Sequence, residues 1–221
     1  MSSWRKTLQG TAYHEAGHIV VAYVLRIAFA GATIRHDRES GFKGKVFCGK
    51  KRPSPTCTLL CTGRRVLDDI DVCLAGPLAQ SMFNRRSVRR WQHMGDYSNA
   101  MTLVQLIVDE KDWERCFGFI EGQMMRTESL LRRHWAVVGC VADALLEHRT
   151  LDRRELVAVI KRARKAASLA RHGSQPWKTF ESRRLFQIFR EQVTGWLPTG
   201  VVVHTASASS EVLKSALEAK P

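Results

Sequence analysis

The hydrophobic pattern near the N-terminus predicts a buried helix followed by two short strands. Apolar residues dominate positions 11–29 and include the unbroken run 19–25, and Gly31 is the stop signal for this helix. The sequence ATIRH at 32–36 then predicts a strand, and a glycine-rich turn leads to a second strand over 45–48.

Beyond the strands, the spacing of apolar residues predicts a helical chain. The segment 51–63 carries two prolines and is predicted to be mostly loop. Helical periodicity then predicts four helices, over 64–83, 96–108, 124–148 and 152–170. Asp152 and Glu155 have the spacing of a capping box at the start of the last helix. The pattern therefore predicts a mainly α fold of the α+β class.

A change in composition divides the chain near residue 172. The sequence RHGSQPW at 171–177 interrupts the helical pattern, and TASASS at 205–210 predicts a flexible stretch before a short terminal helix. We therefore expect a first domain over 1–171 and a partly flexible C-terminal extension over 172–221.

The net positive charge of the chain suggests binding to nucleic acid or to an anionic membrane. The scattered positions of the basic residues weaken this interpretation. The 221 residues include 35 Lys and Arg against 21 Asp and Glu, a formal net charge of +14. The basic residues occur as scattered doublets such as Arg153-Arg154, which are typical of solvated helix faces. A basic nucleic-acid-binding protein is therefore kept only as an alternative.

The cysteines and the apolar runs indicate a reduced, soluble, cytoplasmic protein. The six cysteines form no C-x-x-C pair, and the N-terminal MSSWRKTLQG lacks the apolar core of a signal peptide. The run 19–25 is far shorter than the ~20 residues needed to span a bilayer, so we expect no transmembrane segment.

The sequence HEAGH at 14–18 has the spacing of a zinc-binding helix. Residues four apart on a helix share a face, so His14 and His18 can hold one metal ion. Glu15 lies roughly 100° around the helix, beside the metal but not bound to it, where a general base is needed. Two histidines and a glutamate on a largely buried helix would be costly without a partner, and a metal ion removes this cost.

A catalytic zinc needs a third protein ligand, and spacing alone leaves its identity open. Val21 and Val24 stand where a metzincin has a glycine and its third histidine, so that continuation fails. The acidic candidates further along are Glu39, Asp68, Asp69, Asp71 and Asp96. Glu39 lies in a glycine-rich turn, and the aspartates at 68–71 could face solvent. Asp96 suits an N-cap as well as it suits a ligand.

The sequence GKVFCGKK at 44–51 fits a phosphate-binding loop only in part. Lys51 stands where Ser or Thr must bind magnesium, and the following RPSP cannot open a helix. We therefore expect no nucleotide site here and no unfolding motor in the chain.

Several motifs, in order, resemble the peptidase domain of the FtsH-type membrane-associated AAA+ zinc metalloproteases. They cover about residues 8–165 and are YHEAGHIVVAYVL, ATIRHDRESGFKGKV, DVCLAGPLAQSMF, GDYSNAMTLVQLIV and VADALLEHRTLDRRELVAVI. The zinc helix combined with AG-x-x-A and a later GD-x-x-x-A is more specific than the zinc helix itself. The resemblance implies a helical zincin-type domain over 1–171, with a strand-turn-strand element beside the active-site helix.

The resemblance also implies a ligand set. In that family the third zinc ligand is an aspartate opening the helix that GDYSNA matches, which implies Zn²⁺ bound by His14, His18 and Asp96. Gln80 stands where the family usually has an acidic residue, so a carboxylate beside the ligands is absent at that position. The ATPase domain and membrane anchor that precede the domain in the family have no counterpart in this sequence.

The implied function is a zinc-dependent metalloendopeptidase that hydrolyses peptides or unfolded proteins. Zinc would activate water, with Glu15 as the catalytic base, and the strand over 45–48 would bind an extended substrate by edge pairing. The alternative is a non-catalytic zinc-binding interaction module, against which the retained Glu15 argues. Expected partners are the substrate, an unfoldase or ATPase in trans, and further copies of the chain.

Overall fold

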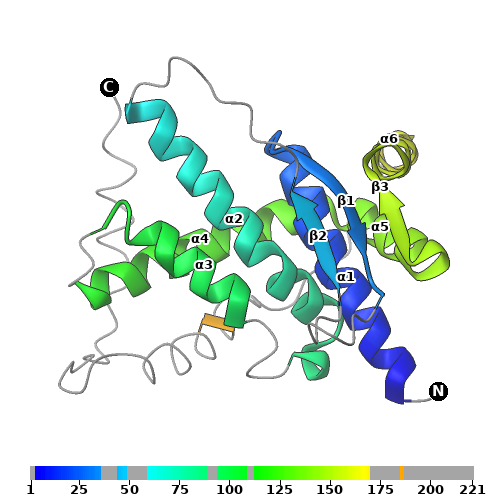
Figure 1. The fold of residues 1–221 in the computed structure, drawn as a ribbon, viewed down its shortest axis with the longest axis horizontal. Helices are drawn as coiled ribbons and strands as arrows, with labels where there is room; N and C mark the ends of the chain where they lie inside the picture. Colours follow the sequence, from blue (N-terminus) through cyan, green and yellow to red (C-terminus); the bar gives the residue numbers. More distant parts are fainter. Residues whose placement is uncertain are drawn as a thin grey trace.

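The long helix α1 (Ser3–Val24) lies near the centre of the molecule, with the other elements around it (Figure 1). The computed structural model describes residues 3–35, 44–48, 59–88, 94–108, 112–169 and 185–186. α1 packs mainly against α2 (Leu59–Phe83) and α5 (Trp135–His148). Small and branched apolar residues of α1 form part of the core, namely Ala12, Ala16, Ile19, Val20, Val21 and Ala22. A helix that is apolar on most faces is stabilised mainly by such burial.

The remaining helices lie on two sides of this central pair. On one side, α3 (Met94–Val104) and α4 (Trp113–Arg133) pack against α2. On the other side lie α5, a small sheet and α6 (Arg153–Leu169) (Figure 1). A short 3₁₀ helix, η1 (Arg85–Ser87), follows α2. The predicted mainly α fold with a small β element is confirmed.

Three antiparallel strands form the sheet, in the order β2-β1-β3. β1 (Phe29–Thr33) pairs with β2 (Lys45–Cys48) and with β3 (Thr150–Asp152). The strand predicted over 45–48 is confirmed, whereas β3 was not predicted. Gly31 lies inside β1, where an added Cβ would be 2.7 Å from the carbonyl oxygen of Leu151. This glycine therefore permits close strand packing, and the prediction that it stops a helix is wrong.

The predicted helix over 11–29 ends too late. The chain leaves α1 at Val24 through a turn in which Arg26 has a φ of 60°. Phe29 is buried in β1, so β1 begins earlier than the strand predicted at 32–36. The apolar run continues smoothly across this turn, which is why helical periodicity did not locate the boundary.

Other helix boundaries also differ from the prediction, since α1 begins at Ser3 rather than at 11 and α3 ends at Val104 rather than at 108. α2 begins at Leu59, inside the segment expected to be a loop. The single helix predicted over 124–148 is two helices, since α4 begins at Trp113 and ends before His134. Asp112 caps α4 by accepting a hydrogen bond from the backbone N–H of Arg115 at 3.0 Å. This cap is a local sequence signal that the apolar pattern did not reveal.

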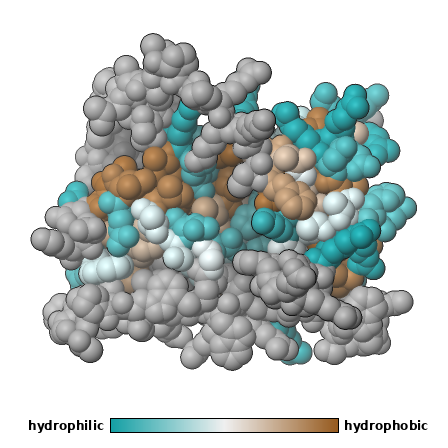
Figure 2. All heavy atoms as spheres, in the orientation of Figure 1, coloured by the Kyte–Doolittle hydropathy of each residue, from teal (hydrophilic) through white to brown (hydrophobic). Residues whose placement is uncertain are grey.

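The capping box predicted for the last helix is confirmed at the start of α6. The carboxylate of Asp152 accepts from the backbone N–H of Glu155 at 2.9 Å, and the carboxylate of Glu155 accepts from that of Asp152 at 2.8 Å. The exposed residues of α6 include Arg153, Arg154, Lys161, Arg162, Arg164 and Lys165. The side of the molecule where α6 lies is accordingly hydrophilic (Figure 2).

Little of the predicted C-terminal extension lies within the described residues. Leu185 is buried in the core, and the ring of Phe186 lies 6.5 Å from that of Phe117. The flexible stretch and terminal helix expected near 205–221 fall outside the described residues. In the described part of the chain, no helix combines the length and the apolar character required to cross a bilayer.

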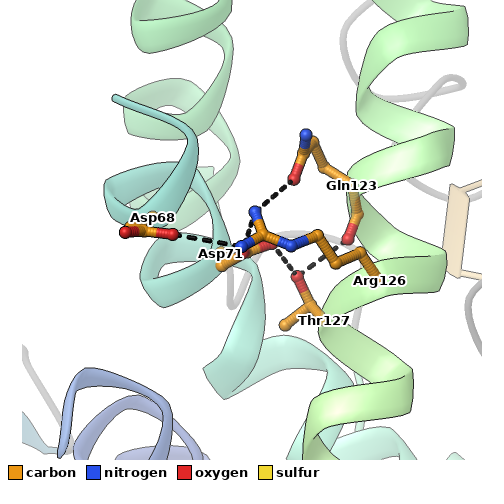
Figure 3. Close-up of polar contacts among 5 residues, drawn as sticks. All are labelled: Asp68, Asp71, Gln123, Arg126 and Thr127. Carbon is orange, nitrogen blue, oxygen red and sulfur yellow. Dashed lines mark hydrogen bonds and ion pairs between the residues drawn. The ribbon is translucent and has the colours of Figure 1, made fainter. Parts of the chain in front are cut away.

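A polar cluster, buried at Asp71 and Thr127, joins α2 to α4 (Figure 3). The carboxylate of Asp71 accepts a hydrogen bond from the hydroxyl of Thr127 at 2.7 Å, and its other oxygen lies 2.7 Å from the guanidinium of Arg126. Arg126 also contacts Asp68 at 3.1 Å. The hydroxyl of Thr127 lies 2.8 Å from the carbonyl oxygen of Gln123, one turn earlier in α4. The cluster therefore fixes how these turns of α2 and α4 face each other.

Replacing Asp71 by asparagine is expected to remove a pH-dependent loss of stability. Burial raises the pKa of Asp71 to about 6, with Asp68 adding to the shift and Thr127 and Arg126 opposing it. Because the folded state then holds this proton to higher pH than the unfolded state, the free energy of unfolding falls as pH rises. From about pH 3 to about pH 7, the wild type should lose on the order of 3 kcal/mol more than Asp71→Asn.

Urea unfolding of the metal-free proteins across this pH range measures the difference between the two. A stability difference that stays constant with pH would show that the carboxyl group of Asp71 titrates alike in the folded and unfolded states.

Candidate metal centre

Two helices supply the residues of the site. α1 carries His14, Glu15 and His18, and α3 carries Asp96 in its first turn. The Nε2 atoms of His14 and His18 lie 3.1 Å apart. One oxygen of Asp96 is 3.2 Å from Nε2 of His14, and the other is 3.6 Å from Nε2 of His18. Residues some eighty positions apart in the chain thus meet at one point.

The spacing of these atoms fits one zinc ion. Ligand atoms about 2.0–2.2 Å from a tetrahedral zinc lie roughly 3.3 Å from one another. One ligand atom from each of His14, His18 and Asp96 falls within 4.8 Å of the other two. Among the described residues, these three form the one group of His, Cys, Asp or Glu with such an arrangement.

The ring of His18 is oriented by a backbone carbonyl. Its Nδ1 lies 2.6 Å from the carbonyl oxygen of Val72 in α2. Since a carbonyl oxygen only accepts, Nδ1 carries the proton and Nε2 faces His14 and Asp96. A hydrogen bond from the ring nitrogen that faces away from the metal is what fixes the tautomer of a metal-binding histidine.

The charges of the group favour a bound cation. Although burial opposes the charged ring, the carboxylate of Asp96, with help from Glu15 and the carbonyl of Val72, raises the pKa of His18 to about 9. Burial would raise the pKa of Asp96, but His18 and His14 together hold it well below its usual range. In the absence of a metal ion the histidines stabilise this carboxylate, and a divalent cation bound between the same atoms would take over that role.

Glu15 lies beside the histidines in a nearly closed environment. Glu15 is only 5% exposed. Burial raises the pKa of its carboxyl group, whereas the two histidines lower it. A Cβ added to Gly44, just before β2, would overlap Oε1 of Glu15. The backbone that leads into β2 thus passes directly over this carboxylate.

The site also depends on two residues of α2 for which the sequence predicted no role, although one of them belongs to the AG-x-x-A motif. One is Val72, whose backbone carbonyl holds His18. The other is Gly76, where an added Cβ would overlap the ring of His18. A glycine inside a long helix is a weak sequence signal for such a close approach. The carbonyl at position 72 leaves no signal in the sequence, because any residue supplies one.

The other acidic candidates for the third ligand are placed elsewhere. Asp68 and Asp71 contact Arg126, Asp69 lies between them on α2, and Glu39 falls outside the described residues. Asp96 lies inside the first turn of α3, which begins at Met94, so it is not the residue that caps this helix. Lys45–Cys48, within the rejected phosphate-loop sequence, is a strand.

Gln80 has a structural partner of its own. It is buried on α2, and its side-chain amide donates to the carbonyl oxygen of Ser87 at 3.0 Å. This bond ties η1 to the end of α2. An acidic residue, which the resemblance would lead one to expect here, has no hydrogen to donate when ionised.

Gln80→Glu is therefore expected to destabilise the protein without emptying the metal centre. Leaving the carbonyl of Ser87 without its donor, next to a buried charge, should cost about 1–3 kcal/mol. Thermal unfolding and zinc content, measured on the same samples, check both parts. Wild-type stability in this variant would mean that the Gln80–Ser87 bond contributes little.

Together these residues pair a donor set suited to zinc with a carboxylate able to take up a proton. Imidazole nitrogens and one carboxylate are common ligands of catalytic zinc, and Glu15 lies on the same helix as the two histidines. Comparison with known proteins adds no family to this description, since neither a protein-family model nor a curated protein sequence matches the chain.

Proposed function

We propose that the protein is a zinc-dependent metalloendopeptidase. The observation that carries the proposal is the convergence of His14, His18 and Asp96 at ligand-like distances. Glu15 stands next to this group, largely buried. A structural zinc site has no use for such a base, and it usually closes the fourth position with another protein ligand.

Bound by these three residues, a zinc ion would supply a Lewis acid for the attacking water and the scissile carbonyl. Glu15 accepts a proton from that water and then donates it to the leaving amine nitrogen. Its burial supports this role, because a raised pKa brings a carboxylate closer to the value useful to a base at neutral pH. The bond from His18 to Val72 keeps the imidazole in one orientation throughout.

The substrate we propose is an extended peptide or an unfolded protein. β2 ends the sheet in the order β2-β1-β3, and among the described strands it pairs on one side only. A substrate strand added to its other edge would run beside Gly44 and hence close to Glu15. Only extended chains can pair in this way, so we propose an ATP-driven unfoldase and further copies of this chain as partners.

Zinc stoichiometry and peptidase activity on the same samples test the function. The wild type is expected to bind one zinc ion per chain and to cleave an unfolded protein such as casein. Asp96→Ala should weaken zinc binding by at least roughly 100-fold and abolish cleavage. Glu147→Ala is the matched control, because it removes an exposed carboxylate on α5.

The other outcomes separate the interpretations. A wild type that binds zinc without cleaving any substrate would support the non-catalytic module. Wild-type zinc binding in Asp96→Ala would exclude Asp96 as a ligand. Steeply salt-dependent binding of DNA, with no bound zinc, would instead favour the nucleic-acid interpretation.

A further inference from the structure

The ring of His18 is held by α2 on one side and faces the other residues of the metal centre on the other. Its Nδ1–H donates to the carbonyl of Val72. The residue directly before Val72 is Asp71, whose fully buried carboxylate is bound by Thr127 and Arg126 of α4 (Figure 3). The metal centre and the polar cluster are thus attached to adjacent residues of one helical turn.

The backbone of α2 is interrupted next to this turn. Pro77 lies inside the helix and has no amide hydrogen, so it cannot give the carbonyl of Cys73 the usual helical bond. A proline in a helix interior weakens the local ladder and is a common place for the axis to bend. Contacts from neighbouring helices therefore contribute more to holding this part of α2 in place than they would in an unbroken helix.

We propose that Asp71 and Thr127 are positioning residues for the metal centre, holding the carbonyl of Val72 where it directs Nε2 of His18 toward Asp96. This proposal rests on the proposed function, in which His18 binds zinc. The hydroxyl of Thr127 connects the two helices, because it lies 2.7 Å from Asp71 and 2.8 Å from the carbonyl of Gln123. Its effect on the histidine would pass through the backbone of α2, from Asp71 to Val72.

Three variants of α4 test the proposal. Thr127→Val keeps the shape of the side chain and removes the hydroxyl, whereas Thr127→Ser keeps the hydroxyl. Ile120→Val trims a buried residue of the same helix outside the polar cluster, and so reports what a loss of packing alone does. If Thr127→Val fails to fold, Arg126→Gln removes the other contact to Asp71 from a half-exposed position.

Two quantities are measured beside the melting temperature. The first is the zinc dissociation constant, by competition with a chromophoric chelator. The second is solvent exchange of the Nδ1–H of His18 in the metal-free protein, by NMR. Thr127→Val should weaken zinc binding roughly three- to tenfold, less than the 10–100-fold typical of groups bonded directly to a ligand. It should also accelerate the exchange, while Thr127→Ser and Ile120→Val keep wild-type values of both.

The positioning role is overturned if Ile120→Val, at an equal loss of melting temperature, changes affinity and exchange as much as Thr127→Val does. It is also overturned if Thr127→Val leaves both unchanged. Failure of the proposed function looks different. In that case the wild type binds no zinc, while exchange of the His18 proton still depends on the hydroxyl at position 127.

Discussion

Glu15→Gln is expected to reduce cleavage of an unfolded protein by about 10²–10⁴-fold or more while one zinc ion per chain stays bound. Glutamine has nearly the shape of glutamate, so it fits the buried space against Gly44. It cannot accept a proton from water, however. The three proposed ligands are untouched by the change, and Asp96 still supplies the negative charge next to the two histidines.

The measurement compares turnover and zinc content of Glu15→Gln with those of Glu147→Gln, which makes the same change at an exposed carboxylate. Retained cleavage in Glu15→Gln would exclude Glu15 as the base. Loss of zinc together with activity would indicate that Glu15 contributes to binding the metal.

The residues of the candidate site differ in how far the sequence could predict them. His14 and His18 follow from helical spacing, because both lie on one helix and their separation fixes their common face. Asp96 lies on a different helix, so its approach depends on how α1, α2 and α3 pack. Spacing left it open between a ligand and a cap, and only the resemblance favoured the ligand. The structure places its carboxylate against both histidines.

The errors in the fold have a related cause. Apolar periodicity reports burial, and it continued through the turn at Arg26 and into β1, where Phe29 is buried in a strand. β3 is three residues long and is defined by its pairing with β1, which local sequence does not encode. By contrast, the capping box of Asp152 and Glu155 is a local bond pattern, and it was predicted correctly.

Gly76→Ala is expected to weaken zinc binding strongly without altering any ligand. The added methyl group would overlap the ring of His18, which cannot retreat easily because the carbonyl of Val72 holds its Nδ1. The two helices are in close contact here, since an added Cβ at Gly17 would be only 2.6 Å from the carbonyl oxygen of Ala75, so moving them apart would lose this packing. We therefore expect the ring to rotate away from the metal position. Zinc affinity should then fall by about 10- to 100-fold.

Alanine is favoured over glycine by about 1 kcal/mol inside a helix. A loss of zinc binding in Gly76→Ala could therefore not be attributed to a weaker helix. Gly118→Ala on α4 is the matched control, since nothing lies within 4 Å of the added Cβ there. It should keep wild-type zinc affinity with equal or higher stability. Circular dichroism would show that Gly76→Ala still has its helices, and chelator competition would measure the loss of zinc. Wild-type affinity in Gly76→Ala would mean that His18 does not lie against this turn of α2, and the ligand geometry proposed for the site would have to be abandoned.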